Sequence, residues 1–139
     1  MTTNSSATGN PRVLVPGRAR GAAVVLEEPL SFWGGVDVDT GRVIDPHHPQ
    51  AGADLAGKVL VMPSGRGSSS SSSVLAEAAR RGTAPAAILL FEPDAVLVLG
   101  AVVARELYRK TVPVVVIGED AVRAGQTVEI DGDRVQVLG

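Results

Sequence analysis

The amino-acid sequence predicts an α/β protein: a mixed β/β/α domain, with a mixed sheet or barrel and two main helices, rather than a doubly wound parallel sheet. Two observations point to this class. The 139 residues are 45% hydrophobic and 20% charged, which is typical of one globular domain with its own core. Along the chain, apolar runs come first, two helical patterns then alternate with further apolar runs, and a hairpin pattern comes last.

The first third of the chain is predicted to hold short strands. Residues 1–11 are small and polar and are expected to be a disordered leader, so that residues 12–139 form a single domain. Residues 13–15 and 22–26 are short apolar runs, each followed by proline or charged residues, and predict strands. Residues 36–45 turn at a Thr-Gly pair, which favours a hairpin.

Two helices are predicted in the middle of the chain. Apolar residues recur at helical spacing after residue 73, and Gly82 is a typical C-terminal stop. Asp94 is a suitable N-cap for a second, almost entirely apolar helix that runs to about Tyr108. Buried strands and a closing hairpin are expected around these helices, at residues 58–62, 86–91, 112–117, 127–130 and 134–138.

Charge and composition argue against several classes of function. The net charge of -2, the lack of a basic run and an aromatic content of 3% argue against binding of nucleic acid. The longest uncharged apolar run, residues 95–104, is about half of the roughly 20 residues that a membrane span needs. No membrane partner is therefore expected, and the cytoplasm is the simplest location. The chain has no cysteine, so it is expected to bind no metal or iron–sulfur cluster by itself.

A glycine–serine loop follows the strand predicted at residues 58–62. The loop reads Ser64-Gly65-Arg66-Gly67-Ser68-Ser69. Backbone N–H groups at a helix start, together with the helix dipole, favour an anion there. Gly67 permits close approach of the backbone to a ligand, and Arg66 offers a fork for a carboxylate or phosphate. Ser68 and Ser69 add hydroxyl groups, so the loop is predicted to bind an anion beside a base or nucleophile.

Two structural explanations compete with this functional one. The six consecutive serines at residues 68–73 are also typical of a low-complexity linker, and serine is a favoured helix N-cap. A linker is not expected between a buried strand and a helix of the same domain, but the pattern alone leaves these explanations open. The loop is not a P-loop, because the Gly-Lys-Ser/Thr ending is absent.

A Gly-Gly pair beside two aromatic residues is a second candidate for the site. Ser31, Gly34 and Gly35 are predicted to line a cleft and to help bind a substrate. The alternative is a tight turn that is packed by Phe32 and Trp33.

Two further features are predicted to have structural roles. His47 and His48 lie in a proline-bounded loop and are expected at the surface. The helix body at residues 95–104 is expected in the core, and apolar surface left exposed on it would indicate packing against a large subunit.

Four segments of the chain resemble one known family. They are residues 27–37, 40–49, 57–63 and 65–69. In this order they are similar to the small subunit, or swivel domain, of the aconitase X family. The resemblance implies a swivelling β/β/α fold, as in the aconitase swivel domain, which agrees with the predicted order of elements.

The resemblance also implies a role for the loop. In this superfamily the first serine after the glycine is the general base, which by position is Ser68. Arg66, Gly67 and Ser69 are then expected to hold substrate oxygens. Family members dehydrate cis-3-hydroxy-L-proline or mevalonate 5-phosphate, and they use an iron–sulfur cluster that cysteines of the large subunit bind. A chain without cysteine fits that division of labour.

Of the two substrates, the resemblance favours cis-3-hydroxy-L-proline. Ser64 stands where the archaeal enzymes for mevalonate 5-phosphate have a basic residue, which weakens the case for a phosphorylated substrate. Mevalonate 5-phosphate is the alternative small hydroxy acid. A non-catalytic swivel module that binds a ligand or a partner is the alternative of another class. As an enzyme subunit, the chain is expected to be active only with the large aconitase X subunit.

Overall fold

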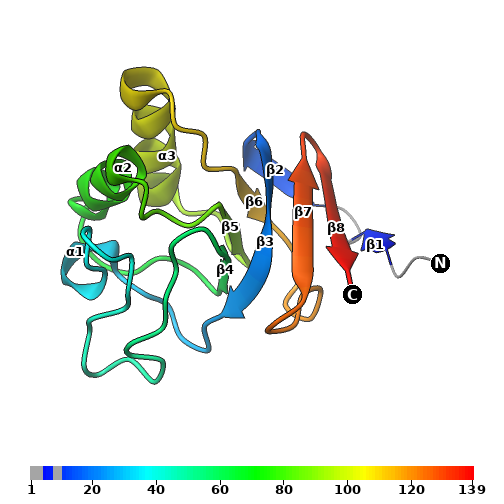
Figure 1. Cartoon of the computed structure of the whole chain (residues 1–139), viewed down its shortest axis with the longest axis horizontal. Helices are drawn as coiled ribbons and strands as arrows, with labels where there is room; N and C mark the ends of the chain where they lie inside the picture. Colours follow the sequence, from blue (N-terminus) through cyan, green and yellow to red (C-terminus); the bar gives the residue numbers. More distant parts are fainter. Residues whose placement is uncertain (1–4, 8–10) are drawn as a thin grey trace.

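The computed structural model describes residues 5–7 and 11–139. These residues form one eight-stranded sheet, with the helices gathered on one side of it (Figure 1). The strands are β1 (Ser5–Ala7), β2 (Arg12–Val15), β3 (Arg18–Val25), β4 (Val59–Met62), β5 (Ala87–Leu90), β6 (Val114–Val116), β7 (Thr127–Asp131) and β8 (Arg134–Leu138), and the helices are α1 (Phe32–Gly35), α2 (Ser71–Arg81) and α3 (Ala95–Tyr108). The order across the sheet is β1-β8-β7-β3-β4-β5-β6-β2.

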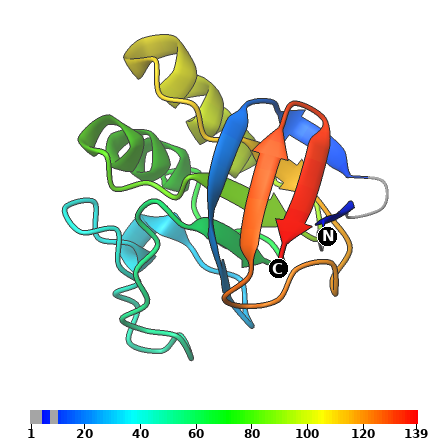
Figure 2. The same cartoon turned by 45° about the vertical axis from the view of Figure 1, so that its right-hand side comes forward.

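The long strand β3 joins two parts of the sheet. Its first part, from Arg18 to Ala22, pairs antiparallel with β7, and its last part, from Ala23 to Val25, pairs parallel with β4. β4, β5 and β6 run parallel to one another, whereas β2 and β8 are antiparallel to their neighbours. The sheet curls at β3, so that the β7–β8 hairpin lies over one face of the parallel strands (Figure 2).

The parallel strands are buried on both faces. Along β4, Leu60 and Met62 belong to a core shared with α2 and α3, while Val59 and Val61 belong to a second core shared with the β7–β8 hairpin. Strands covered on both faces are continuous apolar runs, which explains why β4 and β5 contain no polar residue. The layers are hairpin, parallel strands and helices, which confirms the predicted β/β/α arrangement.

The ends of the two long helices confirm the signals read from the sequence. α2 ends at Gly82, which has a φ of 82° and caps two carbonyl groups of the last turn with its N–H. The Asp94 side chain accepts hydrogen bonds from the first N–H groups of α3. The two helices pack closely at Gly100, where a Cβ atom would lie 2.8 Å from the Ser72 carbonyl oxygen.

The N-terminal prediction is corrected at one strand. Residues 5–7, which the sequence places in a disordered leader, form β1 and pair with β8. The edge of a sheet offers unpaired backbone groups, so a segment of small polar residues can add to it without an apolar pattern that sequence analysis would detect. Residues 1–4 and 8–10 lie outside the described part of the chain, and the domain boundary at residue 12 stays a prediction.

Two loop predictions are also corrected. Residues 36–45 turn back as predicted, but their antiparallel pairing is limited to one β-bridge, between Val36 and Val43, and does not extend into two strands. His48, expected at the surface, is buried: its Nε2 lies 3.1 Å from the Glu28 carbonyl oxygen, and its Nδ1 accepts the Gln50 N–H at 3.0 Å. His48 therefore ties this loop to the chain that follows β3, which is a structural role.

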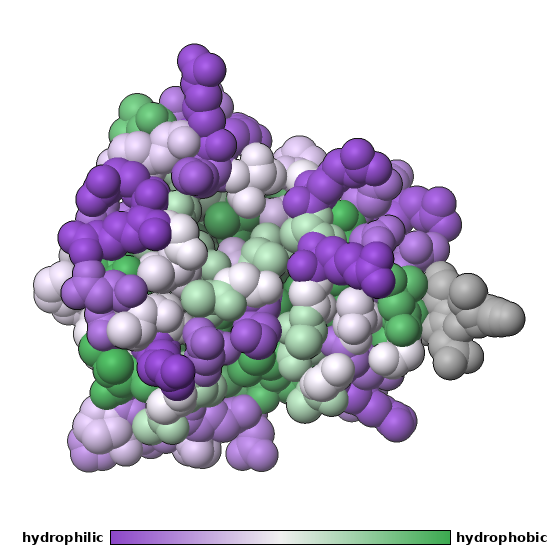
Figure 3. Space-filling model, viewed as in Figure 1, coloured by the Kyte–Doolittle hydropathy of each residue, from purple (hydrophilic) through white to green (hydrophobic). Residues whose placement is uncertain are grey.

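The helical layer is only partly covered. Leu97 and Ala101 of α3 are buried as expected, but Leu99 is 53% exposed and Leu107 is 68% exposed. On the face seen in Figure 3, hydrophilic residues separate small groups of apolar ones. Within residues 5–7 and 11–139, no helix combines the length and the apolar character needed to cross a membrane.

Candidate functional site

The glycine–serine loop lies at the carboxyl edge of the parallel strands, between β4 and α2. The connection from β5 to α3 leaves the sheet at the same edge, where α/β folds place their ligands. Asp94 links the two connections, because its Oδ2 accepts the Gly65 N–H at 3.0 Å while its Oδ1 caps α3. A Cβ atom on Gly65 would lie 2.5 Å from that Oδ2, so glycine is required beside this carboxylate.

A second segment, around α1, lies against the loop through two serines. The Trp33 N–H donates to Ser71 Oγ at 3.1 Å, and Ser31 Oγ donates to the Trp33 carbonyl oxygen at 3.0 Å. The two hydroxyl oxygens are 3.3 Å apart, so Ser71 is the donor between them. Ser71 is only 3% exposed. The three residues therefore form a closed ring of hydrogen bonds that fixes α1 to the start of α2.

Gly67 brings the loop next to this ring. Its φ of 85° is a left-handed conformation that suits glycine, and a Cβ atom there would lie 3.4 Å from Ser31 Oγ. The structure thus places Ser31 beside the loop, although the two residues are far apart in the sequence.

A small pocket lies between the loop and these neighbours. Its walls are Leu30, Phe32, Gly65, Arg66, Gly67, Ser71, Asp94, Val96 and Leu97. The centres of water molecules can occupy about 40 Å³ of it, which is room for a few waters and not for a whole hydroxy acid. The described residues therefore do not enclose a substrate of that size at this pocket.

The start of α2 satisfies more of its own donors than the sequence predicts. The Ser70 N–H donates to Ser68 Oγ at 3.0 Å, and the next three N–H groups donate to carbonyl oxygens of residues 68–70. In the described part of the chain, no residue accepts a hydrogen bond from the N–H groups of Gly67, Ser68 and Ser69. The donors available to an anion are thus those of the loop, not those of the first helical turn.

Ser68 and Arg66 flank these available donors. Ser68 is half-buried, and the N–H that its Oγ accepts favours negative charge on that oxygen. The N-terminus of α2 acts in the same direction, by about 0.3–1 kcal/mol. Arg66 is exposed and forms an ion pair with no described residue. The arrangement can hold a carboxylate next to a hydroxyl that is able to exchange a proton.

The residues predicted to form the site fall into two groups. Those on the loop or beside it are Ser31, Arg66, Gly67, Ser68 and Ser69. Gly34 is exposed, and a Cβ atom there would meet nothing within 4 Å. Gly35 is buried, and its Cβ atom would lie 3.0 Å from Leu30 Cδ1, on the core side of α1 and away from the pocket.

Sequence reasoning missed two contributions to the site. Ser71 could not be distinguished within six serines, although it stands four residues before Leu75, on the buried face of the helix. Asp94 was predicted only as a helix cap, because its bond to Gly65 joins residues 29 positions apart. Long-range contacts of this kind depend on the packing of the parallel strands, which no local pattern encodes.

The residues of this chain do not fit an iron–sulfur cluster. Such clusters are held by cysteine thiolates, and the chain has no cysteine. Within residues 5–7 and 11–139, no three His, Asp or Glu side chains gather as metal ligands would. A cluster of the kind that the resemblance implies therefore needs ligands from outside this sequence.

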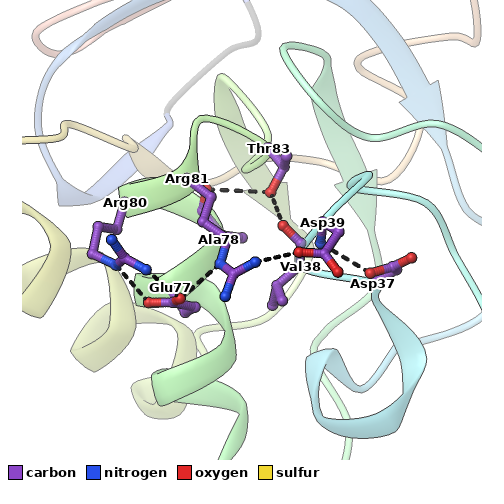
Figure 4. Close-up of polar contacts among 8 residues, drawn as sticks. All are labelled: Asp37, Val38, Asp39, Glu77, Ala78, Arg80, Arg81 and Thr83. Carbon is purple, nitrogen blue, oxygen red and sulfur yellow. Dashed lines mark hydrogen bonds and ion pairs between the residues drawn. The ribbon is translucent and has the colours of Figure 1, made fainter.

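The far end of α2 carries a network of charged residues (Figure 4). Glu77 accepts hydrogen bonds from Arg80 at 2.7 and 2.8 Å and from Arg81 at 2.7 Å, and Arg81 also pairs with Asp39. The bonds from Arg80 and then from Arg81 lower the pKa of Glu77 from 4.5 to about 2. This network ties the loop that contains Asp39 to α2, and its charges are paired with one another.

The three-layer fold and the glycine–serine loop at its sheet edge define a domain of the swivel class. The chain belongs to the aconitase X swivel domain family, whose model matches residues 8–138.

Relatives with two activities are similar to this chain. The cis-3-hydroxy-L-proline dehydratase of Pseudomonas aeruginosa is 52% identical over 109 residues, which are 78% of this chain and 19% of that protein. The phosphomevalonate dehydratase small subunit of Pyrococcus furiosus is 39% identical over 127 residues, which are 91% of this chain and 90% of that protein. The chain thus spans about a fifth of the length of the first relative and most of the second.

Solved structures give the same fold. The holo-form of Thermococcus kodakaraensis aconitase X superposes with a TM-score of 0.84 at 33% identity, over 94% of this chain and 97% of that one. A solution structure of a UPF0107 protein gives a TM-score of 0.80 at 32% identity, over 97% and 99% of the two chains. These matches confirm the predicted swivel-type α/β fold.

Proposed function

We propose that this chain is the small, swivel subunit of an aconitase X-type dehydratase that acts only with a large subunit. One observation carries the proposal. The loop places Arg66 and Gly67 at a pocket that is too small to enclose a substrate, and the next residue, Ser68, carries a half-buried hydroxyl beside available N–H donors. A ligand held there needs a second surface. Relatives named small subunits, and a longer relative of which this chain spans about a fifth, support a large subunit as that surface.

In this proposal Ser68 is the general base. Its Oγ takes a proton from the carbon next to the substrate carboxylate, a carbon–carbon double bond forms and the hydroxyl on the adjacent carbon leaves as hydroxide; that hydroxide and the proton taken by Ser68 together make up the water that is released. The Ser70 N–H stabilises negative charge on Oγ. The helix N-terminus contributes only about 0.3–1 kcal/mol, which is too little to ionise a hydroxyl. Exclusion of water on docking and charges of the large subunit must supply the remainder.

The substrate carboxylate is assigned to Arg66 and to the N–H groups of Gly67 and Ser69. A guanidinium binds a carboxylate through two parallel hydrogen bonds, and no described residue competes for this one. The hydroxyls of Ser69 and Ser31 are next to this position and are proposed to hold further substrate oxygens. The iron–sulfur cluster is assigned to the large subunit, since this chain lacks thiolates.

The proposed substrate is cis-3-hydroxy-L-proline. It carries one carboxylate, which the single arginine of the loop matches. Mevalonate 5-phosphate carries a phosphate as well, and Ser64 occupies the position where a basic residue would serve it. A cis-3-hydroxy-L-proline dehydratase is 52% identical over 78% of this chain, and a phosphomevalonate dehydratase small subunit is 53% identical over 57% of it, so the choice of substrate rests on the loop. Phosphomevalonate dehydratase small subunits are also related, so mevalonate 5-phosphate is the second candidate.

The test is co-expression with a large subunit that carries the cluster cysteines, followed by assays of both substrates. We expect turnover of cis-3-hydroxy-L-proline by the complex, and none by either subunit alone. Turnover of mevalonate 5-phosphate in its place would reassign the substrate. A complex that forms but converts neither compound would favour the non-catalytic swivel module.

A further inference from the structure

Two large apolar side chains are exposed on α1 and next to it. Trp33 in α1 is 59% exposed, and Ile44 is 52% exposed. The Ile44 N–H donates to the Gly35 carbonyl oxygen at 2.8 Å, which sets Ile44 next to α1. Gly34 lies between them and is exposed as well. We call these three residues, Trp33, Gly34 and Ile44, the α1 rim.

The backbone that presents the Trp33 indole is held firmly. Its N–H and its carbonyl oxygen are both bound, to Ser71 and Ser31 respectively, in the ring of hydrogen bonds described above. A fixed backbone removes the cost of ordering this segment when a partner binds. Tryptophan is also enriched among the few residues that carry most of the energy of an interface. An exposed indole on a fixed backbone is therefore suited to anchoring a protein–protein contact.

The α1 rim is continuous with the proposed half-site. Phe32, the neighbour of Trp33, lines the pocket, and so does Ser71, which binds the Trp33 N–H. A surface that closes this pocket would thus reach residues that adjoin or bind Trp33. In the Pseudomonas aeruginosa relative this domain accounts for 19% of the chain, so most of that protein lies outside the part that this chain matches.

We infer that the α1 rim is the docking surface for the large subunit, with Trp33 as the anchor residue. The inference rests on the proposed function, since it assigns the partner of the same site. Trp33 inserts into an apolar pocket of the large subunit, and Ile44 extends the contact. Docking there brings the second wall of the substrate site over the loop.

The experiment measures the affinity of this chain for the purified, cluster-loaded large subunit, without substrate, by biolayer interferometry. Trp33→Ala is expected to raise Kd by about 30-fold or more, which is the size of effect typical of an anchor residue. Ile44→Ala is expected to raise it by about 3- to 10-fold. Both side chains are exposed, and urea denaturation of each variant verifies that folding is unchanged.

Leu107→Ala is the comparison variant, because the exposed apolar side chains of α3 are the other candidate surface for the large subunit. Leu107 is 68% exposed and lies in the last turn of α3, which Figures 1 and 2 place at the far end of the helical layer from α1. The Kd of the Leu107→Ala variant for the large subunit is expected to stay within about 2-fold of the wild-type value, as for an ordinary surface substitution. An equal loss in Leu107→Ala and Trp33→Ala would overturn the choice of anchor.

Other outcomes separate this inference from its alternatives. An unchanged Kd in Trp33→Ala, with a raised KM in the complex, would place the indole on the substrate and overturn the inference. A homodimer of the isolated chain that Trp33→Ala dissociates, seen by light scattering, would assign the rim to a second copy instead. A Trp33-dependent complex that converts neither substrate would leave the inference standing while the proposed dehydratase function fails.

Discussion

The two ends of α2 differ in how their charged and polar groups are paired. At the C-terminal end, Glu77, Arg80, Arg81 and Asp39 are paired among themselves. At the N-terminal end, Arg66 has no acidic partner among the described residues, and the N–H groups of the adjacent loop have no acceptor. Paired charges stabilise a fold and have little left to offer a ligand. The donors at the N-terminal end are exposed or half-buried and available to a ligand, which is why the site is proposed there.

Only the N-terminal end of α2 is proposed to need another molecule to complete it. The charged network at the C-terminal end closes within this chain and fixes a loop to α2. The N-terminal end is half of a pocket, and its hydroxyl has no proton acceptor of its own among the described residues. The predictions below probe the incomplete end first and the complete end last.

The largest effect is expected for Ser68→Ala. Loss of the general base should lower kcat of the reconstituted complex by about 10²- to 10⁴-fold, because that is the usual contribution of proton transfer by a positioned side chain. Steady-state turnover of cis-3-hydroxy-L-proline measures it. Ser73→Ala is the control: it removes a hydroxyl from the same serine run on an exposed face of α2, and turnover should stay near the wild-type value.

A smaller effect is expected for Arg66→Gln. This change removes a charge-assisted hydrogen bond to the substrate carboxylate, which is worth about 1.5–3 kcal/mol. The ratio kcat/KM of the complex should then fall by about 10- to 100-fold, with most of the change in KM. Arg134→Gln, at an exposed position of β8, should leave kcat/KM unchanged. A wild-type KM in Arg66→Gln would remove this guanidinium from the substrate site.

Ser71→Ala should act on stability as well as on the site. The change leaves the Trp33 N–H and the Ser31 hydroxyl without their buried partner, at a cost of about 1–3 kcal/mol in the free energy of unfolding. Urea denaturation followed by circular dichroism measures this cost. Ser73→Ala, in the same turn but exposed, should stay within about 0.5 kcal/mol of the wild type. Equal stability of the two variants would contradict the hydrogen-bonded ring.

The smallest effect is expected at the paired end of α2. Arg80 and Arg81 lower the pKa of Glu77 to about 2 in the folded chain, so unfolding takes up a proton between that pH and 4.5. The stability that Glu77 contributes is therefore fully present above pH 4.5 and is lost as the pH falls towards 2. Urea midpoints of the wild type and Glu77→Gln should differ at pH 7 and converge near pH 2. A difference that stays constant with pH would show that the ion pairs contribute nothing.

Local patterns were sufficient to predict most of the fold. The apolar runs gave the buried strands, Gly82 and Asp94 marked helix ends, and the glycine–serine loop fell between strand and helix. These features depend on residues that are near one another in the sequence. The resemblance to the aconitase X family then predicted the swivel-type fold, which the superposed structures confirm.

The remaining features depend on contacts between distant segments. β1 pairs through backbone groups that any small residues supply, and α1 is held by a serine 38 positions away. His48 is buried because the chain after β3 passes over it. The loop partner of Asp94 is set by the adjacency of β4 and β5. Only its position four residues before Leu75 distinguishes Ser71 from its five serine neighbours, and its partners Trp33 and Ser31 are set by the packing of the helix.

The most direct test of the half-site is a mixing experiment. A limiting amount of large subunit is combined with a fixed excess of this chain, in which the fraction of Ser68→Ala is varied. If the chain docks through its α1 rim and supplies the base from its loop, the variant should occupy the large subunit without restoring turnover, and the rate should fall in proportion to its fraction. Full turnover with Ser68→Ala alone would contradict the account.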